Sequence, residues 1–375
     1  MKAAFAFPEL QERPPQRPAH CPRCGQVGMG RHRVHRRPVV DPKVTEVEVV
    51  QYRCWSCKAS LTVTPPGLGH DRRHSERTKV MSVVLWGLGL SSEDVARVMR
   101  GLGAPISDVG VLLNVRAMGA EARQRQKKAV GKIKTCVLGA DETEVKLSGN
   151  GVTLGFLTDP GTGEIVGMEI LTSREGEELG RWIVAAAKRF GAKALVSDEL
   201  ESYKPAAEKA GLEHQLCLAH WRKAVARRLQ KIEGYPEEKK LIREALKQLD
   251  HKGLGAIRWL HQHFRGARPP RKGQKQSPEY ALRMLTLDIL ENWNRLVCYQ
   301  QTHARFRDKL GRHIPRRYQV PSTNNATENA IGRGGKIRAK RMRGFKRGDT
   351  ILPIMFLLAS LSGVLAGVPF QSLLT

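Results

Sequence analysis

An aspartate inside an otherwise apolar stretch is the first candidate for chemistry in this chain. Thr135–Leu147, TCVLGADETEVKL, is rich in residues that favour a β-strand, and Asp141 interrupts it. A carboxylate placed where the chain otherwise needs burial is costly unless a cation meets it. Asp141 is therefore either a capping residue at the end of a strand or part of a site that holds a cation. Side chains alternate along a strand, so Glu142 and Glu144 are expected to face away from Asp141.

A second aspartate follows a similar pattern. Ala192–Val196 is a short apolar run that leads directly into Asp198. Strand ends that lie side by side in a mixed sheet would bring Asp198 next to Asp141. Glu199 is expected to be a neighbour of this site rather than a ligand, and Asp159 is expected to belong to a hairpin turn.

A third acidic residue, Glu328, lies in a predicted helix with the sequence STNNATENAI. One interpretation is structural, because Asn325 as N-cap and Glu328 three residues later match a reciprocal capping box. A carboxylate beside the basic run that follows would also suit a metal ion that meets a phosphate backbone. Glycines after Glu328 weaken the helix, so we expect it to be short. The basic run contains no acid and consists of Arg333, Lys336, Arg338, Lys340, Arg341, Arg343, Lys346 and Arg347.

Four of the seven cysteines form two C-x-x-C pairs, Cys21 with Cys24 and Cys54 with Cys57. Each pair presents two sulfurs to one ion, and tetrahedral Zn²⁺ binds four such ligands. The spacing predicts a zinc ribbon over residues 1–70, and the alternative is a set of redox-active or free thiols. The ribbon also carries arginines that we expect to contact phosphates: Arg31, Arg33, Arg36, Arg37 and Arg53.

The composition indicates a partner of opposite charge. The chain has 375 residues, and its 64 Lys and Arg against 36 Asp and Glu give a net charge of +28. A chain this basic most often binds a polyanion, and nucleic acid is the commonest one. The N-terminus lacks the pattern of a signal peptide, so we expect a cytoplasmic, nucleoid-associated protein. Ile351–Phe370 approaches the length of a membrane span, but its prolines favour a buried helix.

Three helices are predicted within residues 71–132. They cover Arg77–Trp86, Val95–Met99 and a longer segment that begins at Val109 and continues into a basic tail. This arrangement is typical of a helix-turn-helix DNA-binding domain, and the basic tail favours that interpretation. An ordinary small helical bundle has the same pattern and is the alternative.

The segments around the three acids follow the order of an RNase H-like α/β domain with a mixed sheet. A three-stranded meander leads to a helix at Glu175–Phe190, then to strands and helices that alternate up to residue 232. We assign residues 133–232 and 319–375 to this domain, and residues 233–318 to a helical insertion. The expected elements after the meander are the strand Ala192–Val196, helix Tyr203–Ala210, strand Glu213–Leu218, helix Trp221–Ile232, and insertion helices near Glu237–Gln248, Leu254–Phe264 and Ser277–Tyr299.

Four motifs together resemble those of a bacterial insertion-sequence DDE transposase: DET at Asp141, SDELESY at Asp198, C-x-x-H at Cys217–His220, and TNNATEN at Glu328. The C-x-x-H motif is similar to that of Mutator-type enzymes. The resemblance implies cleavage and strand transfer of DNA, with Asp141, Asp198 and Glu328 as ligands of Mg²⁺ or Mn²⁺. It also implies double-stranded DNA as partner, a homodimer or higher oligomer on that DNA, and no membrane association.

Several alternatives remain open from the sequence. Cys217 and His220 form either part of a metal site or, as we favour, a buried thiol and a hydrogen-bonded histidine. Trp293 belongs either to a helical core or, less expectedly, to a surface that stacks on a base. The rival functions are a DNA-binding regulator without catalysis and an RNase H-like nuclease that cuts without joining.

Overall fold

The computed structural model describes residues 6–13, 16–68, 73–171, 177–308, 310–342 and 344–370. The chain divides into two compact units. The first unit comprises Met1–Lys127 and Gly334–Thr375, and the second comprises Lys128–Arg333. The segment from Gly334 onwards thus groups with the N-terminal residues, whereas the sequence analysis assigned it to the domain of the acids. The four-part domain division stays a prediction.

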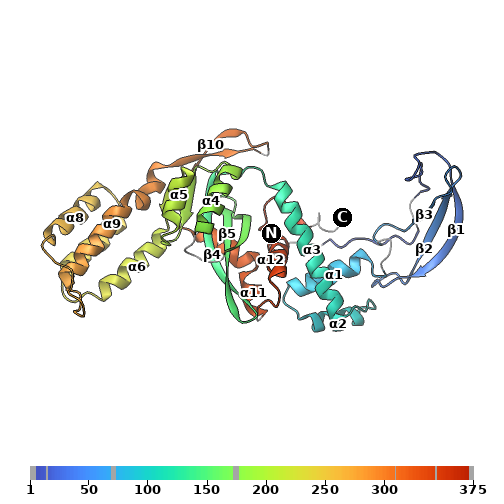
Figure 1. Cartoon of the computed structure of the whole chain (residues 1–375), viewed down its shortest axis with the longest axis horizontal. Helices are drawn as coiled ribbons and strands as arrows, with labels where there is room; N and C mark the ends of the chain where they lie inside the picture. The colour runs from blue at the N-terminus through green and yellow to red at the C-terminus, as the bar shows by residue number, and fades with distance from the viewer. Residues whose placement is uncertain are drawn as a thin grey trace. The chain divides into compact units, whose positions relative to one another are not determined.

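A three-stranded antiparallel ribbon forms the N-terminal part of the first unit (Figure 1). Buried and exposed side chains alternate over much of the central strand, which places Val47 and Val49 in a small core with Leu10 and Leu68. Its other core packs around Cys21 and Cys54. The ribbon consists of β1 (Met29–Pro38), β2 (Glu46–Cys54) and β3 (Ser60–Val63).

Helices make up the rest of the first unit. Ser75 and Ser91 cap the first two helices, because their side chains accept hydrogen bonds from the amides of Thr78 and Asp94. The three helices expected from the sequence are present, and that they bind DNA stays a prediction. Among the described residues, no helix combines the length and the apolar character that crossing a bilayer requires. The helices are α1 (Glu76–Gly87), α2 (Ser92–Gly101), α3 (Asp108–Ala129), α11 (Ile337–Arg341) and the largely buried α12 (Ile351–Leu361).

The second unit contains a mixed five-stranded sheet in the order β6-β5-β4-β7-β8, which confirms the predicted mixed α/β class (Figure 1). The meander β4-β5-β6 is antiparallel, and β7 and β8 add to it in parallel with β4. The strand β4 is therefore central and carries Asp141. The strands are β4 (Val137–Leu147), β5 (Asn150–Asp159), β6 (Glu164–Leu171), β7 (Ala194–Ser197) and β8 (Glu213–Leu216), with helices α4 (Glu177–Phe190) and α5 (Tyr203–Ala210) between them.

Four further helices pack around a hydrophobic core that includes Trp221, Ile257, Leu285 and Trp293. Trp293 is 6% exposed, so it belongs to this core and does not form an open stacking surface. The predicted insertion helices are confirmed to within a few residues at their ends. These helices are α6 (Leu218–Gln230), α7 (Pro236–Gln248), α8 (His251–His263) and α9 (Pro278–Gln301).

The sequence analysis named only helices as the elements within residues 233–318 and did not predict a β-hairpin there. A β-hairpin follows α9 and consists of β9 (His303–Arg307) and β10 (His313–Gln319). Its side chains are mainly basic and largely exposed, so the alternation of apolar and polar residues that identifies a strand is weak. Phe306 packs edge-on against Tyr318, and Arg316 lies over the Phe306 ring.

Helix α10 (Asn325–Ile331) carries Glu328 and is short, as predicted. The backbone kinks within Gly332–Lys336, where Gly335 adopts the non-helical φ of 135°. An L-residue with a side chain rarely adopts this conformation, so glycine is required where the helix ends.

Candidate active site and metal-binding groups

The register of two parallel strands places Asp141 beside Asp198. Gly139 of β4 pairs with Val196 of β7, and the two aspartates each follow this pair by two residues. Parallel strands advance together, so both carboxylates emerge at the same level of the sheet. The last residue of β7 is Ser197, which puts Asp198 just beyond the paired part of the sheet.

A third carboxylate, that of Glu142, joins this pair. One oxygen from each of Asp141, Glu142 and Asp198 lies within 4.8 Å of the other two. The sequence analysis kept Glu142 out of this site, and the proximity of its carboxylate to both aspartates corrects that exclusion. We call these three residues the acidic group.

Tyr203 orients the carboxylate of Glu142. Its hydroxyl donates a hydrogen bond to Glu142 Oε1 from helix α5. Burial, reinforced by the neighbouring carboxylate of Glu142, raises the pKa of Tyr203 well above its ordinary value, so the phenol keeps its proton and remains a donor. One oxygen of Glu142 is thereby fixed, and the carboxylate cannot rotate freely.

A chain of hydrogen bonds supports the end of β7. Arg295 Nε donates to His214 Nδ1 at 3.2 Å, and His214 Nε2 lies 2.9 Å from Ser197 Oγ, which donates to the carbonyl of Asp198 at 3.0 Å. Burial and the charge of Arg295 lower the pKa of His214 to about 3, so this imidazole is neutral at physiological pH. Because Nδ1 accepts from Arg295, the proton resides on Nε2 and is donated to Ser197. Helix α9 is thus connected to the strand end that presents Asp198.

Helix α10 lies against the same part of β4. Asn324 Nδ2 donates to the carbonyl of Ala140 at 2.8 Å, and the hydroxyls of Thr327 and Thr158 are 2.8 Å apart. A Cβ added at Gly139 would lie 2.0 Å from Thr327 Oγ1, so only glycine permits this close approach. Glu328 follows Thr327 directly, and the start of α10 is therefore bonded to the residue that precedes Asp141.

Replacing Gly139 by alanine should displace α10 and with it Glu328. We expect a loss of about 1–3 kcal/mol in the free energy of unfolding, together with a loss of DNA cleavage. The matched control is Gly131→Ala, because a Cβ at Gly131 meets open space. Thermal melting and a cleavage assay on both variants check this prediction. A Gly139→Ala protein with wild-type stability and activity would contradict the assigned packing.

The side chain of Glu328 lies nearer to Cys217 and His220 than to the acidic group. Its Oε1 is 3.7 Å from His220 Nδ1, and one ligand atom from each of Glu328, Cys217 and His220 lies within 4.8 Å of the other two. The predicted capping box is wrong in its register, because Asn325 is already the first helical residue. Asn324 occupies the N-cap position, and its side-chain amide donates to the sheet.

Two other acids have the positions expected from the sequence. Asp159 is the last residue of β5, where the hairpin turn begins, and its carboxylate accepts from the amides of Lys134, Thr135 and Gly161. Glu199 is exposed next to Asp198, and partial desolvation followed by the charge of Asp198 raises its pKa. Neither residue belongs to the acidic group.

The acidic group has the donors that a hard divalent cation prefers. Mg²⁺ binds carboxylate oxygens, keeps several waters and is usually held by one or two carboxylates. Asp141 and Asp198 supply such oxygens side by side, and Glu142 supplies another in the same space. These residues therefore fit a Mg²⁺ or Mn²⁺ site.

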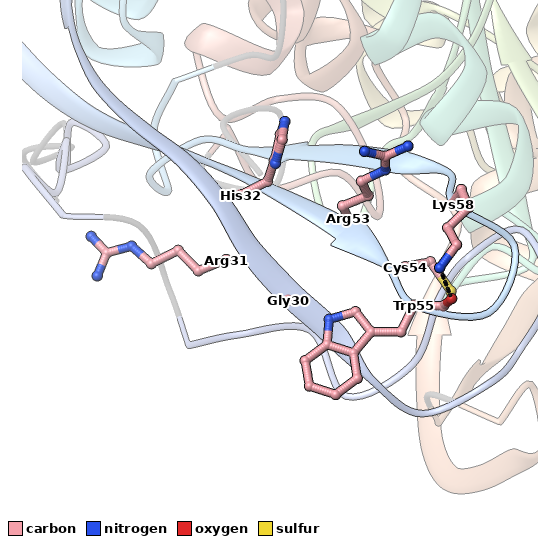
Figure 2. A pocket seen from close by; sticks show the side chains of 7 residues that line it. All are labelled: Gly30, Arg31, His32, Arg53, Cys54, Trp55 and Lys58. Atoms are coloured by element: carbon pink, nitrogen blue, oxygen red, sulfur yellow. Dashed lines mark hydrogen bonds between the residues drawn. The ribbon is translucent and has the colours of Figure 1, made fainter.

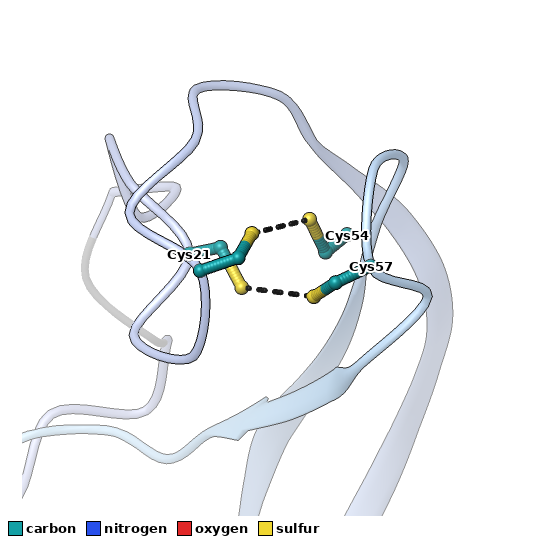
Figure 3. A group of neighbouring side chains, drawn as sticks. Cys21, Cys54 and Cys57 are labelled. Atoms are coloured by element: carbon teal, nitrogen blue, oxygen red, sulfur yellow. Dashed lines mark hydrogen bonds between the residues drawn. The ribbon is translucent and has the colours of Figure 1, made fainter.

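The four ribbon cysteines fit a zinc ion closely (Figure 3). Cys21 Sγ lies 3.6 Å from Cys57 Sγ, and Cys24 Sγ lies 3.7 Å from Cys54 Sγ. Tetrahedral ligation with Zn–S bonds of about 2.3 Å requires sulfurs about 3.8 Å apart. Hydrogen bonds from the backbone amides of Cys24 and Arg23 lower the pKa of Cys21 to about 6, which favours the thiolate that zinc binds.

Purified protein should therefore contain one zinc ion that survives dialysis against a mild chelator, and Cys54→Ser should lose it. Structural zinc contributes directly to folding, so the ribbon should unfold in that variant while the second unit keeps its helices. Cys298→Ser, which alters a buried cysteine of α9, is the control and should retain the zinc. Metal analysis and limited proteolysis make the comparison. A zinc-free protein with an intact ribbon would refute the assignment.

A basic pocket of about 330 Å³ lies on the ribbon (Figure 2). Trp55 is 68% exposed, and its indole packs on Gly30, where a Cβ would meet Nε1 at 2.3 Å. No acidic side chain is among the described residues that line this pocket. An exposed aromatic ring surrounded by cations is suited to a nucleotide. The charged and polar lining consists of Arg31, His32, Arg53 and Lys58.

The basic residues predicted to contact DNA have different environments. On β1, Arg31, Arg33 and Arg36 are exposed and Arg37 is half-buried. Arg338 has partners within the chain: its guanidinium donates to the carbonyls of Gly89 and Leu90 and lies over Trp86, so it stabilises the end of α1, and its contact with DNA stays a prediction. Arg343 lies outside the described residues. Of the other predicted contacts, the exposed residues are Arg333, Lys340, Arg341 and Lys346, and Lys336 is half-buried.

Comparison with known proteins identifies the family. Residues 83–347 match the model of the family described as Transposase IS66 family, which is of the DDE class. No curated protein matches the chain. Among solved structures, the catalytic core domain of BIV integrase is similar at 10% identity over 41% of this chain and 83% of that chain, with a TM-score of 0.19. A likeness this weak adds nothing to the assignment.

The family match corrects one part of the sequence analysis. The likeness to Mutator-type enzymes is not supported, because the match is to another insertion-sequence family. Membership implies that the protein binds DNA and uses a divalent metal ion. The match extends over most of the chain and includes Asp141, Asp198, Glu328 and the C-x-x-H motif. The chain belongs to the IS66 family of DDE transposases.

Proposed function

We propose that this transposase binds the ends of its transposon and cleaves and joins DNA strands at Asp141, Asp198 and Glu328. The observation that carries the proposal is the register of β4 and β7, which aligns the two aspartates. Helix α10 supports the third assignment, because its start is bonded to the residue before Asp141 and Glu328 lies within its first turn. The proposal requires the side chain of Glu328 to turn from His220, 3.7 Å away, towards the aspartates.

The side chains hold the site in a defined geometry. Asp141 and Asp198 are the proposed primary ligands of Mg²⁺ or Mn²⁺, and Glu142, oriented by Tyr203, adds negative charge beside them. When bound, a pair of such ions activates the attacking oxygen and stabilises the leaving oxygen of an in-line displacement at phosphorus. The hydrogen bonds from His214 through Ser197 keep Asp198 at the level of Asp141.

We further propose that recognition of the ends belongs to the ribbon and to helices α1–α3. The basic pocket around Trp55 and the exposed arginines of β1 supply cations for phosphates. Two ends must be brought together for strand transfer, so we infer a dimer or higher oligomer on DNA, working at the nucleoid in the cytoplasm.

The test is an assay of labelled duplexes that carry the ends of the element, incubated in Mg²⁺ with an unlabelled target duplex. The proposal predicts a nick at the end and a joined product of higher mass. Cleavage without joined product would favour a nuclease, and binding without cleavage would favour a DNA-binding regulator. Omission of the divalent metal is the control and should abolish both products.

Changes in the ribbon pocket should weaken binding through lost phosphate and stacking contacts. Arg53→Ala should lower affinity for duplex DNA and reduce the slope of log affinity against log salt by about 1. Trp55→Ala should lower affinity with little change in that slope, because a stacking contact releases no counterions. Binding titrations at several salt concentrations separate the two. Equal slopes for Arg53→Ala and wild-type protein would exclude Arg53 as a phosphate contact.

A further inference from the structure

A second possible metal site lies next to the acidic group and has a different chemistry. Cys217 precedes α6 directly, and His220 follows it by three residues, so both side chains lie on one side of the first helical turn. Glu328 of α10 completes the cluster, and one ligand atom from each of the three lies within 4.8 Å of the others. We call these residues the mixed group.

The contacts within the mixed group leave it suited to a ligand. Cys217 is 1% exposed, and its Sγ accepts the backbone N–H of Asn324 at 3.3 Å. In the part of the chain that the structure describes, His220 Nδ1 is buried and has no hydrogen-bond partner, since Glu328 Oε1 is 3.7 Å away. A buried polar atom without a partner is costly, and coordination to an ion would satisfy it.

The donor set points to zinc rather than to magnesium. Thiolate, imidazole and carboxylate are all zinc ligands, whereas Mg²⁺ takes oxygen donors. Three protein ligands also leave the fourth position of a tetrahedral ion open to water. The mixed group therefore favours Zn²⁺ over the Mg²⁺ that the acidic group fits.

We propose that Cys217, His220 and Glu328 bind a Zn²⁺ ion, and that this ion inhibits the transposase by removing Glu328 from the catalytic site. The inhibitory part rests on the proposed role of Glu328 in catalysis. A carboxylate that binds zinc beside His220 is not available to a metal held by Asp141 and Asp198. Free zinc would then lower activity without occupying the acidic group.

Zinc stoichiometry tests the site without relying on catalysis. Full-length protein equilibrated in a zinc-buffered solution should bind two zinc ions, one in the ribbon and one in the mixed group. Cys217→Ser, His220→Asn and Glu328→Gln should each bind one, and the control Cys298→Ser should bind two. His220→Asn leaves the buried thiol in place, so it keeps the test valid if Cys217→Ser fails to fold. Two zinc ions in all of these variants would overturn the proposal.

Inhibition of cleavage tests the competition. At fixed Mg²⁺, added Zn²⁺ should inhibit the wild-type protein, and Cys217→Ser should need more than about tenfold more Zn²⁺ for the same fractional inhibition. Each rate is normalised to the zinc-free rate of the same variant. Equal sensitivity in the two proteins would overturn the inhibitory role. The two proposals can fail separately. If the wild-type protein never cuts DNA, the proposed function is refuted. If the variants still lose the second zinc ion in that case, the zinc site is retained.

Discussion

Replacing Asp198 by asparagine should abolish DNA cleavage and strand transfer, with a fall in rate of at least about a thousandfold. Asparagine keeps the size of the side chain, and its Oδ1 can still accept the amide of Leu200, as Asp198 does at 3.1 Å. Only the negative charge and one acceptor oxygen are lost, and these are what a divalent cation requires. Asp141→Asn should have the same effect, because its carboxylate occupies the aligned position on β4.

The control for this prediction lies on the same strand. Glu144 is exposed on β4, outside the acidic group, so Glu144→Gln should retain cleavage. DNA binding by Asp198→Asn should persist or become tighter, because a negative charge that faces phosphate is gone. Cleavage kinetics, binding titrations and thermal melting on the three proteins give the comparison. An Asp198→Asn variant that cleaves at near wild-type rate would remove Asp198 from the site.

The main features of the site follow from local patterns in the sequence. Asp141 and Asp198 each end an apolar run, and parallel pairing of two such strands was sufficient to predict that they meet. The spacing of the four cysteines in two C-x-x-C pairs was sufficient to predict that they form one group. In both cases the ligand residues lie within or next to a clear sequence pattern, an apolar strand or a C-x-x-C pair. Their positions can therefore be predicted without knowledge of the tertiary packing.

The roles of Glu142 and Arg338 depend on packing that no local pattern reveals. Alternation along β4 kept Glu142 out of the predicted site, but its carboxylate lies close to both aspartates, and Tyr203 reaches Glu142 from 61 residues further along the chain. Arg338 lies in a basic run, which predicts a DNA contact. Its guanidinium nevertheless donates to the carbonyls of Leu90 and Gly89, which are 248 and 249 residues away in the chain. Prediction from sequence infers the role of a side chain from the residues next to it in the chain, whereas Glu142 and Arg338 form their contacts with residues that are distant in the chain.

Glu328→Gln should abolish cleavage and strand transfer as completely as Asp198→Asn, while the fold persists. Helix α10 is anchored by the hydrogen bond from Asn324 to Ala140 and by the pair of Thr327 and Thr158, and neither involves the Glu328 side chain. Glutamine has almost the same shape and can serve in a helix cap, but it carries no charge for a metal ion. A capping role would therefore leave Glu328→Gln active, and a ligand role would not.

Asn325→Ala is the matched control for this distinction. Asn325 is exposed at the first position of α10, so its replacement should change the free energy of unfolding by less than about 0.5 kcal/mol. If Asn325 and Glu328 formed a capping box, the same change would cost about 0.5–2 kcal/mol. Thermal melting of both variants, measured with the cleavage assay, separates the two roles. A Glu328→Gln protein that cuts and joins DNA at the wild-type rate would show that Asp141 and Asp198 work without Glu328, and Glu142, already within 4.8 Å of both, would then be the third carboxylate.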